Sequence, residues 1–172
     1  MAIQTIFDTG STYSIQSAYD GATYESAMHN DDSICRGVGD EFTMDSNSTS
    51  LKVTFKAGSE AVIGGSFFKI TADTTVTLKA NSTIYLCATI DKTRTNGDRG
   101  YFEQRTSASI QKGSINGSDS VRDMLLYVIT TNASGVTSVV DKRKRSTQFV
   151  YLTEAEYSAL TSKDADTYYF VS

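Results

Sequence analysis

The chain has 172 residues, of which 39% are hydrophobic and 21% are charged, and its formal net charge is −4. This length suits a single domain with its own hydrophobic core, and the negative charge argues against nucleic acid as a partner. The sequence has no apolar run of about 18 residues, so we expect no membrane-spanning helix and no membrane insertion. Ten Tyr and 8 Phe with no Pro and no Trp, in a chain rich in Ser and Thr, favour a β-rich protein.

The first thirty residues divide into two parts. Residues 1–16 are polar with scattered apolar positions, and we interpret them as an extended arm. They lack the charged and then apolar layout of a signal peptide, so we expect synthesis in a cytoplasm without individual export. Residues 17–30 are different, because Tyr24, Ala27 and Met28 recur at helical spacing and predict a short helix.

From residue 41 onward the period of the apolar residues shortens to two. Residues 51–55 alternate between apolar and polar side chains, which predicts a half-buried strand. Gly64 and Gly65 separate two short apolar runs and predict a hairpin. Residues 83–90 are apolar almost throughout, which is typical of a strand in the centre of a sheet.

The strand pattern continues to about residue 147. Residues 124–129 form the most apolar run and predict a fully buried strand, although periodicity alone leaves a helix open. Strands separated by turns every 8 to 12 residues or so indicate a sandwich or barrel, and we predict an all-β, jelly-roll-like sandwich. Further strands are expected at 61–63, 67–70, 74–78, 101–110 and 136–140.

The pattern changes again in the last 25 residues or so of the chain. Residues 149–152 predict a strand, Thr153 and Glu156 match a capping box for a helix over 154–160, and residues 167–171 predict a final strand. A β-α-β unit of this size cannot bury a core alone, so it must pack on the main domain, a second copy or a partner chain. We therefore predict an arm at 1–16, a sandwich with a leading helix at 17–147, and an assembly appendage at 148–172.

Residues for covalent chemistry are scarce. His29 is the one histidine, and neither a nucleophile elbow nor a phosphate-binding glycine loop accompanies it. The acidic pairs fall in turns or helix starts, where carboxylates are favoured for local reasons. We expect no enzyme, no cofactor and no metal, although a loop calcium site is left as an alternative at Asp91, Asp98 or Asp119. The acidic pairs are Asp31–Asp32, Asp40–Glu41, Glu154–Glu156 and Asp164–Asp166.

Two other features have structural interpretations. Cys87 lies inside an apolar run and is predicted to be a buried thiol, while a disulfide with Cys35 has no support in the sequence. The basic run 142–145 follows the strand at 136–140, and we interpret it as a solvated strand end or loop. Binding of nucleic acid or acidic lipid by this run is the alternative.

Tyrosine is the one enriched candidate for a binding surface, because its side chain supplies contact area with little loss of entropy. The tyrosines gather mostly at the two ends of the chain. Core and sheet packing is the alternative to an assembly surface. These end tyrosines are Tyr13, Tyr19, Tyr24, Tyr151, Tyr157, Tyr168 and Tyr169, and the candidate assembly interface comprises Tyr151, Tyr157, Tyr168, Tyr169 and Phe170.

The order of these segments resembles a module of tailed-phage tail and baseplate proteins. The resemblance begins with LKVTFKAGSEAVIGGSFFKI at residues 51–70 and continues with the strand that ends at Asp91. It extends through the apolar strand at 124–129 to the closing Asp-Lys-Arg at 141–143. The segment with Tyr24, upstream of the first strand, also fits.

The end of the chain resembles a motif of tail-fibre and minor structural proteins, in YLTEAEY at 151–157 and KDADTYYFV at 163–171. The two resemblances imply a phage virion structural protein of the tail, baseplate or fibre attachment, made in the host cytoplasm. They imply that it binds other tail or baseplate proteins and forms homo-oligomers, with trimers favoured. The alternatives are a module that binds host cell-wall saccharide and a head-decoration or neck protein.

Overall fold

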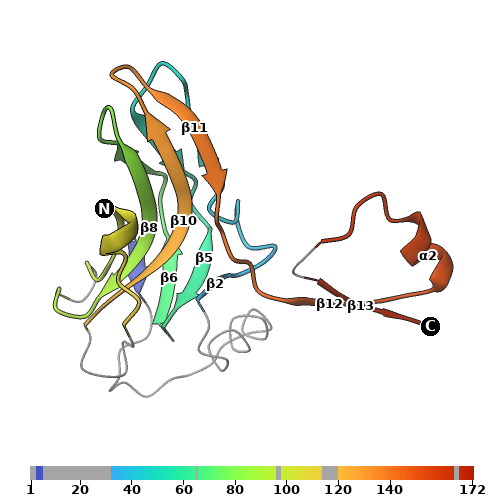
Figure 1. Ribbon diagram of the computed structural model, residues 1–172. Coiled ribbons are helices and arrows are strands. Elements are labelled where there is room, and N and C mark those ends of the chain that lie inside the picture. Colours follow the sequence, from blue (N-terminus) through green and yellow to red (C-terminus); the bar gives the residue numbers. More distant parts are fainter. Residues whose placement is uncertain (1–2, 6–31, 65, 96–97, 114–119, 165–166) are drawn as a thin grey trace.

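The computed structural model describes residues 3–5, 32–64, 66–95, 98–113, 120–164 and 167–172. The helix predicted over 17–30 lies outside this set. The described residues form an all-β sandwich with a small appendage at its side, which confirms the predicted class (Figure 1). The elements of the first half are β1 (Ile3–Thr5), β2 (Ser33–Ile34), β3 (Met44–Asp45), β4 (Lys52–Phe55), β5 (Glu60–Ile63), β6 (Ser66–Ile70) and β7 (Thr74–Thr77). Those of the second half are β8 (Thr83–Asp91), β9 (Gly100–Arg105), the 3-10 helix η1 (Ser107–Ser109), β10 (Val121–Thr131), β11 (Val136–Asp141), β12 (Gln148–Leu152), α2 (Glu154–Ala159) and β13 (Thr167–Val171).

The sandwich is built from antiparallel sheets with the strand orders β1-β6-β5-β2, β11-β10-β8-β9 and β3-β4-β7. β8 lies between β10 and β9, so its predicted central position is confirmed. The predicted hairpin joins β5 to β6, where Ile63 pairs with Ser66 and Gly64 takes a φ of 55°. β1 pairs with β6, so residues 3–5 of the predicted arm belong to a sheet. The predicted strand at 101–110 is wrong in its second half, because β9 ends at Arg105 and the backbone turns into η1.

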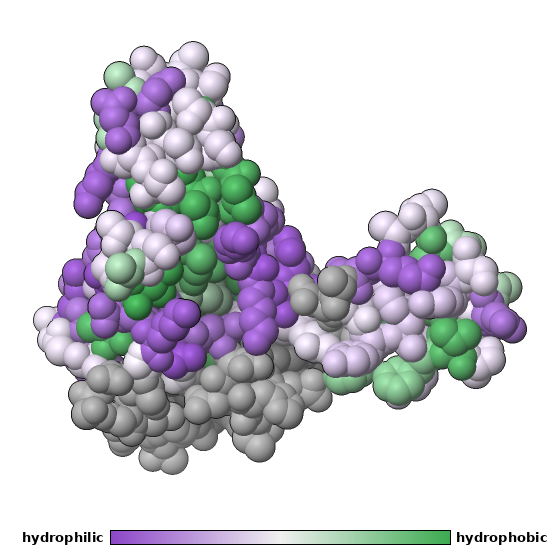
Figure 2. Space-filling model, in the orientation of Figure 1, coloured by the Kyte–Doolittle hydropathy of each residue, from purple (hydrophilic) through white to green (hydrophobic). Residues whose placement is uncertain are grey.

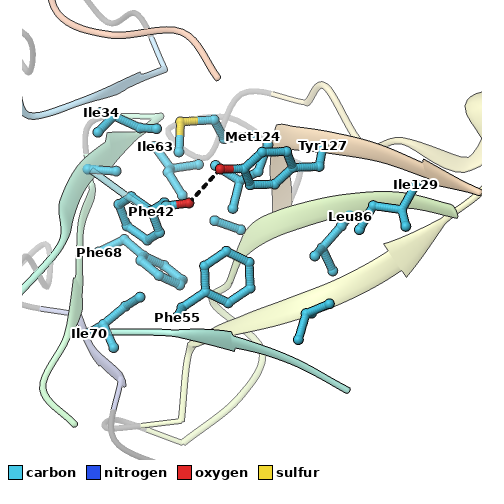
Figure 3. Packing of buried hydrophobic residues seen from close by; sticks show 14 of the residues in the cluster. Ile34, Phe42, Phe55, Ile63, Phe68, Ile70, Leu86, Met124, Tyr127 and Ile129 are labelled. Atoms are coloured by element: carbon cyan, nitrogen blue, oxygen red, sulfur yellow. Dashed lines mark hydrogen bonds between the residues drawn. The ribbon is translucent and has the colours of Figure 1, made fainter. Parts of the chain in front are cut away.

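The core lies between the sheet of β8 and β10 and the sheet of β5 and β6 (Figure 3). Every second residue of β8 from Ile84 to Ile90 is buried in it, as the period of two requires. Aromatic rings fill the space between the layers: Phe55 stacks on Phe102 at 4.3 Å between ring centres, and Phe68 meets Phe102 edge-on at 5.8 Å.

A β-bulge in β10 changes which residues face the core. The register with β8 shifts between Leu125 and Tyr127, so that Leu126 and Tyr127, which are neighbours in the chain, are both buried. The Tyr127 hydroxyl donates a hydrogen bond to the Phe42 carbonyl at 2.9 Å. The bulge therefore gives the core one additional side chain and a polar anchor for the loop that contains Phe42.

That loop, residues 37–43, is held in an uncommon conformation. Glu41 and Phe42 have φ values of 49° and 56°, in the left-handed region that non-glycine residues rarely adopt. The Phe42 N–H donates to Ser59 Oγ at 3.0 Å, and Gly39 approaches the backbone at Gly58 so closely that a Cβ has no space there. These contacts offset a strain of about 1 to 3 kcal/mol for each left-handed residue.

A buried ion pair fastens β9 and the following turn to β10. The Asp123 side chain is fully buried and accepts from Arg105 Nε at 2.9 Å, Thr89 Oγ1 at 2.7 Å and the Gln111 N–H at 2.8 Å. Both carboxylate oxygens are thus satisfied, which is the condition under which a buried charge is tolerated.

Both cysteines are buried and neither forms a disulfide, and the burial of Cys87 is as the sequence predicts. Burial is the main cause that raises the pKa of Cys87 to about 12, so this thiol is protonated and unreactive at neutral pH.

Candidate assembly surface

The appendage is a β-α-β unit that lies to one side of the sandwich (Figure 1). Its strands β12 and β13 pair in parallel, from Gln148 with Thr167 to Leu152 with Val171. The predicted capping box is confirmed, because Glu156 N–H donates to Thr153 Oγ1 while Thr153 N–H donates to the Glu156 carboxylate at 2.8 Å. Among the side chains of the appendage whose burial the structure describes, none is fully buried.

One face of this small sheet presents four exposed aromatic side chains, which we call the aromatic column: Phe149, Tyr151, Tyr168 and Phe170. The parallel register places Phe149 opposite Tyr168 and Tyr151 opposite Phe170. The rings stack at 5.6 Å and 5.0 Å between centres in these two pairs, and Phe149 lies 6.1 Å from Phe170. Tyr151 is 79% exposed and Tyr168 is 63% exposed, so a large aromatic area faces solvent.

The opposite face of the sheet is partly covered by α2. Tyr157 of the helix contacts Tyr169 of β13 at 5.5 Å between ring centres, and the Lys163 ammonium lies 4.4 Å from the centre of the Tyr157 ring. Two parallel strands normally have both faces covered, and two strands with one helix turn or so make only a marginal unit. The exposed aromatic column is therefore the candidate assembly surface of this unit.

Ion pairs and main-chain hydrogen bonds hold the appendage to the sandwich. The Arg36 guanidinium binds the Asp164 carboxylate at 2.7 Å and Thr167 Oγ1 at 3.3 Å, and the Arg36 N–H donates to Ser146 Oγ at 3.2 Å. Ile34 N–H donates to the carbonyl of Lys144 at 2.8 Å, so β2 supports the connection that leads to β12.

The basic run at 142–145 is the second part of this connection, and its interpretation as a solvated segment is wrong for both arginines. The Arg143 side chain is only 9% exposed, binds Asp141 at 2.6 Å and donates to the Glu41 carbonyl at 2.9 Å. Arg145 Nε binds the Glu41 carboxylate at 2.6 Å. Arg143 and Arg145 thus bind residues 142–147, the connection between β11 and β12, to the loop at 37–43, and we call these two contacts with Glu41 the latch.

Comparison with known protein families assigns the two parts separately. The model of the lactophage receptor-binding protein N-terminal shoulder domain matches residues 5–143, which is most of the chain. The chain belongs to this shoulder-domain family. Residues 147–172 match the model of the phage tail tip domain, and no curated protein matches the chain. The protein is therefore a structural component of a phage tail, as predicted, and its partners include other tail proteins.

The boundary between the two matched regions falls within the latched connection. The shoulder domain ends at residue 143 and the tail tip domain begins at residue 147.

Both families are structural tail domains, and in the described part of the chain no three His, Cys, Asp or Glu side chains come close enough to hold a metal ion. No described helix is both long and apolar enough to cross a membrane.

The predicted interface residues divide between the two faces of the tail tip sheet. Tyr151, Tyr168 and Phe170 lie together in the aromatic column, whereas Tyr157 and Tyr169 pack on each other beside α2. Phe149 also belongs to the column, although the sequence does not predict it as an interface residue. The alternation of exposed and half-buried residues along β12, combined with a parallel register, is the signal that identifies it.

The other predicted chemical residues serve the fold or lie outside the described set. Asp32 binds Arg122 at 2.9 Å, and Asp91 accepts from Thr93 Oγ1 at 2.6 Å and from the Thr93 N–H at 2.9 Å. The bonds of Asp91 are local, whereas Asp32 is held by a residue far away in the sequence. The residues outside the described set are Tyr13, Tyr19, Tyr24, His29, Asp31, Asp119 and Asp166.

Because the latch includes the ion pair of Arg145 with Glu41, we expect acid to weaken the attachment of residues 142–147 to the loop at 37–43. Burial acts to raise the pKa of Glu41, but the Gly37 N–H and Arg145 outweigh it and hold the pKa below its ordinary value of 4.5. The stabilisation is therefore present above the ordinary pKa and is lost as the pH falls through the lowered value. We expect the protection factors of the amides at residues 143–146 to fall as the pH drops below the ordinary carboxylate pKa of 4.5. In Glu41→Gln exchange should already be fast at pH 7, and an unchanged pH profile in this variant would contradict the role of the carboxylate.

Proposed function

We propose that the tail tip domain is the assembly unit of this chain and that the aromatic column is its interface with neighbouring chains. The observation that carries this proposal is the exposure of four stacked aromatic side chains on a two-stranded parallel sheet. Buried aromatic anchors dominate the binding energy of protein interfaces, and an unpartnered parallel sheet gains stability when its second face is covered.

The assembly formed in this way is a homo-oligomer, with a trimer favoured by the sequence resemblance, in the tail or baseplate of the virion. The shoulder domain then supplies a rigid sandwich, and the tail tip domain supplies the contacts. The mechanism is binding and not covalent chemistry. Closed symmetric assemblies of this kind repeat one interface and therefore multiply the effect of one aromatic face.

The geometry of the rings favours a protein partner over a saccharide at this face. A sugar stacks on an open ring face, but Phe149 and Phe170 lie inside the column, with neighbours that stack at 5.6 Å and 5.0 Å. The two inner rings therefore present mainly their edges to a partner, whereas the terminal rings of Tyr151 and Tyr168 each stack on one neighbour and are 79% and 63% exposed. Ring edges pack well into an apolar protein surface, where edge-to-face contacts are favoured.

The proposal is tested by removing the column and measuring the assembly. We expect the double variant Tyr151→Ala and Phe170→Ala to remain folded and to lower the native mass from oligomer to monomer, because these rings are exposed and bear no core contact. Val171→Ala, on the other face of the same strand, is the matched control and should keep the oligomer. Native mass spectrometry and labelling of intact particles give the readouts.

Deletion of residues 149–172 provides a second test. The shoulder domain should keep its cooperative thermal transition while oligomers and incorporation into particles are lost. If the deleted chain unfolds, residues 149–172 belong to the core of the sandwich. If the double variant stays oligomeric, the aromatic column is not the interface.

A further inference from the structure

A second unpartnered surface lies on the shoulder domain, along β11. After Val136 every residue of this strand is exposed, including Val139 at 41% and Val140 at 47%. Among the described strands β11 pairs with β10 alone, so it forms the edge of its sheet. Edge strands are normally protected by Lys, Pro or inward charges, whereas β11 contains neither Lys nor Pro and its one charged residue is Asp141 at its end.

The tail tip domain carries features that complement this edge. β12 pairs with β13 only, among the described strands, and so has an open edge of its own. The first turn of α2 follows β12 directly and contains Glu154 and Glu156, while the exposed Lys142 follows β11. Within one chain these surfaces stay apart, because the connection from β11 leads the tail tip domain away from the sandwich (Figure 1).

We propose that β12 of one copy adds in parallel to the β11 edge of a second copy, which extends the sheet β9-β8-β10-β11 through the tail tip strands. Parallel addition places the acidic first turn of α2 beside Lys142, whereas antiparallel addition would place it at the other end of β11, beside Val136. Strand addition satisfies the main-chain groups of both edges and covers the exposed valines. This inference rests on the proposed function and specifies the surface that receives the tail tip domain.

Each chain then carries one donor strand and one acceptor strand. Such a contact is heterologous, and it closes into a ring when the rotation between copies is a whole fraction of a turn. Figure 2 shows apolar surface on the visible face of the sandwich and a further apolar area on the tail tip domain.

The test uses the full-length chain and measures the dissociation constant of the oligomer by sedimentation. Val139→Glu should weaken association at least tenfold while the circular dichroism spectrum stays unchanged, because Val139, which is 41% exposed and pairs with Ile129 of β10, has a strand on its second side only in the assembly. Thr77→Glu, an exposed threonine on the edge strand β7, is the matched control and should leave the constant unchanged.

Charge reversal separates this inference from general assembly and does not alter the core. Glu154→Lys should weaken association by about three-fold at low salt, and adding Lys142→Glu should restore it. If the Tyr151→Ala and Phe170→Ala variant dissociates while Val139→Glu and the charge reversals change nothing, the proposed function stands and strand addition at β11 is overturned. Restoration by the double reversal supports the parallel orientation.

Discussion

Replacing Gly39 with alanine is expected to destabilise the shoulder domain by about 3 kcal/mol. Gly39 has a φ of 59°, which costs an alanine about 1 to 2 kcal/mol. Its new Cβ would also meet the main chain of Gly58 and lie 2.5 Å from Ser59 N, and backbone atoms cannot rotate away as a side chain does. The loop at 37–43 would have to move away from the turn at Gly58.

Gly37 provides the matched control two residues earlier. It has a φ of 74°, but a Cβ at Gly37 meets nothing within 4 Å. Gly37→Ala should therefore cost only the backbone term of about 1 kcal/mol. Urea unfolding of the two variants measures the difference. Equal losses in both would show that the close approach of Gly39 to Gly58 contributes nothing to stability.

Removal of the buried Asp123 carboxylate is the second large effect. Asp123→Ala leaves the Arg105 guanidinium, whose side chain is 20% exposed, without its ion pair and leaves the Gln111 N–H without its acceptor. Breaking one partner of a buried pair costs about 3 to 5 kcal/mol. We place the loss near 3 kcal/mol because Arg105 can regain some water.

Asp73→Ala is the control for this effect, because Asp73 pairs with Lys56 at 2.9 Å on the surface. Surface pairs contribute little, so its unfolding midpoint in urea should change far less than that of Asp123→Ala. Thr89→Val removes one bond to the same carboxylate and should fall between the two, at about 1 kcal/mol. A midpoint for Asp123→Ala equal to that of Asp73→Ala would contradict the role of the network.

The strands and the tail tip helix could be predicted because their signals are local. Alternation along residues 51–55 and the capping box of Thr153 with Glu156 depend only on neighbours in the chain, and both appear in the structure. The bulge that buries Leu126 beside Tyr127 could not be predicted, because a shift of register is decided by the partner strand.

The latch and the composition of the aromatic column could not be predicted from the sequence, because both depend on contacts between segments that are apart in the chain. Arg143 and Glu41 are separated by about a hundred residues, and only the fold brings them together. The sequence does not predict Phe149 as part of the column, because face assignment in β12 depends on pairing with β13. Tyrosine enrichment directed attention to the end of the chain, whereas the assignment of each ring to a face of the sheet requires the register.

The parallel pairing of β12 and β13 has a mechanical consequence. β12 begins at the sandwich and β13 ends at the far side of the sheet, so a pulling force between the sandwich and Ser172 acts along both strands in opposite senses. All hydrogen bonds between the strands then share the load in shear. In a hairpin the same force would act on the hydrogen bond at the open end first, and the bonds would break one after another. The tail tip sheet is thus oriented to resist tension between the sandwich and the end of β13.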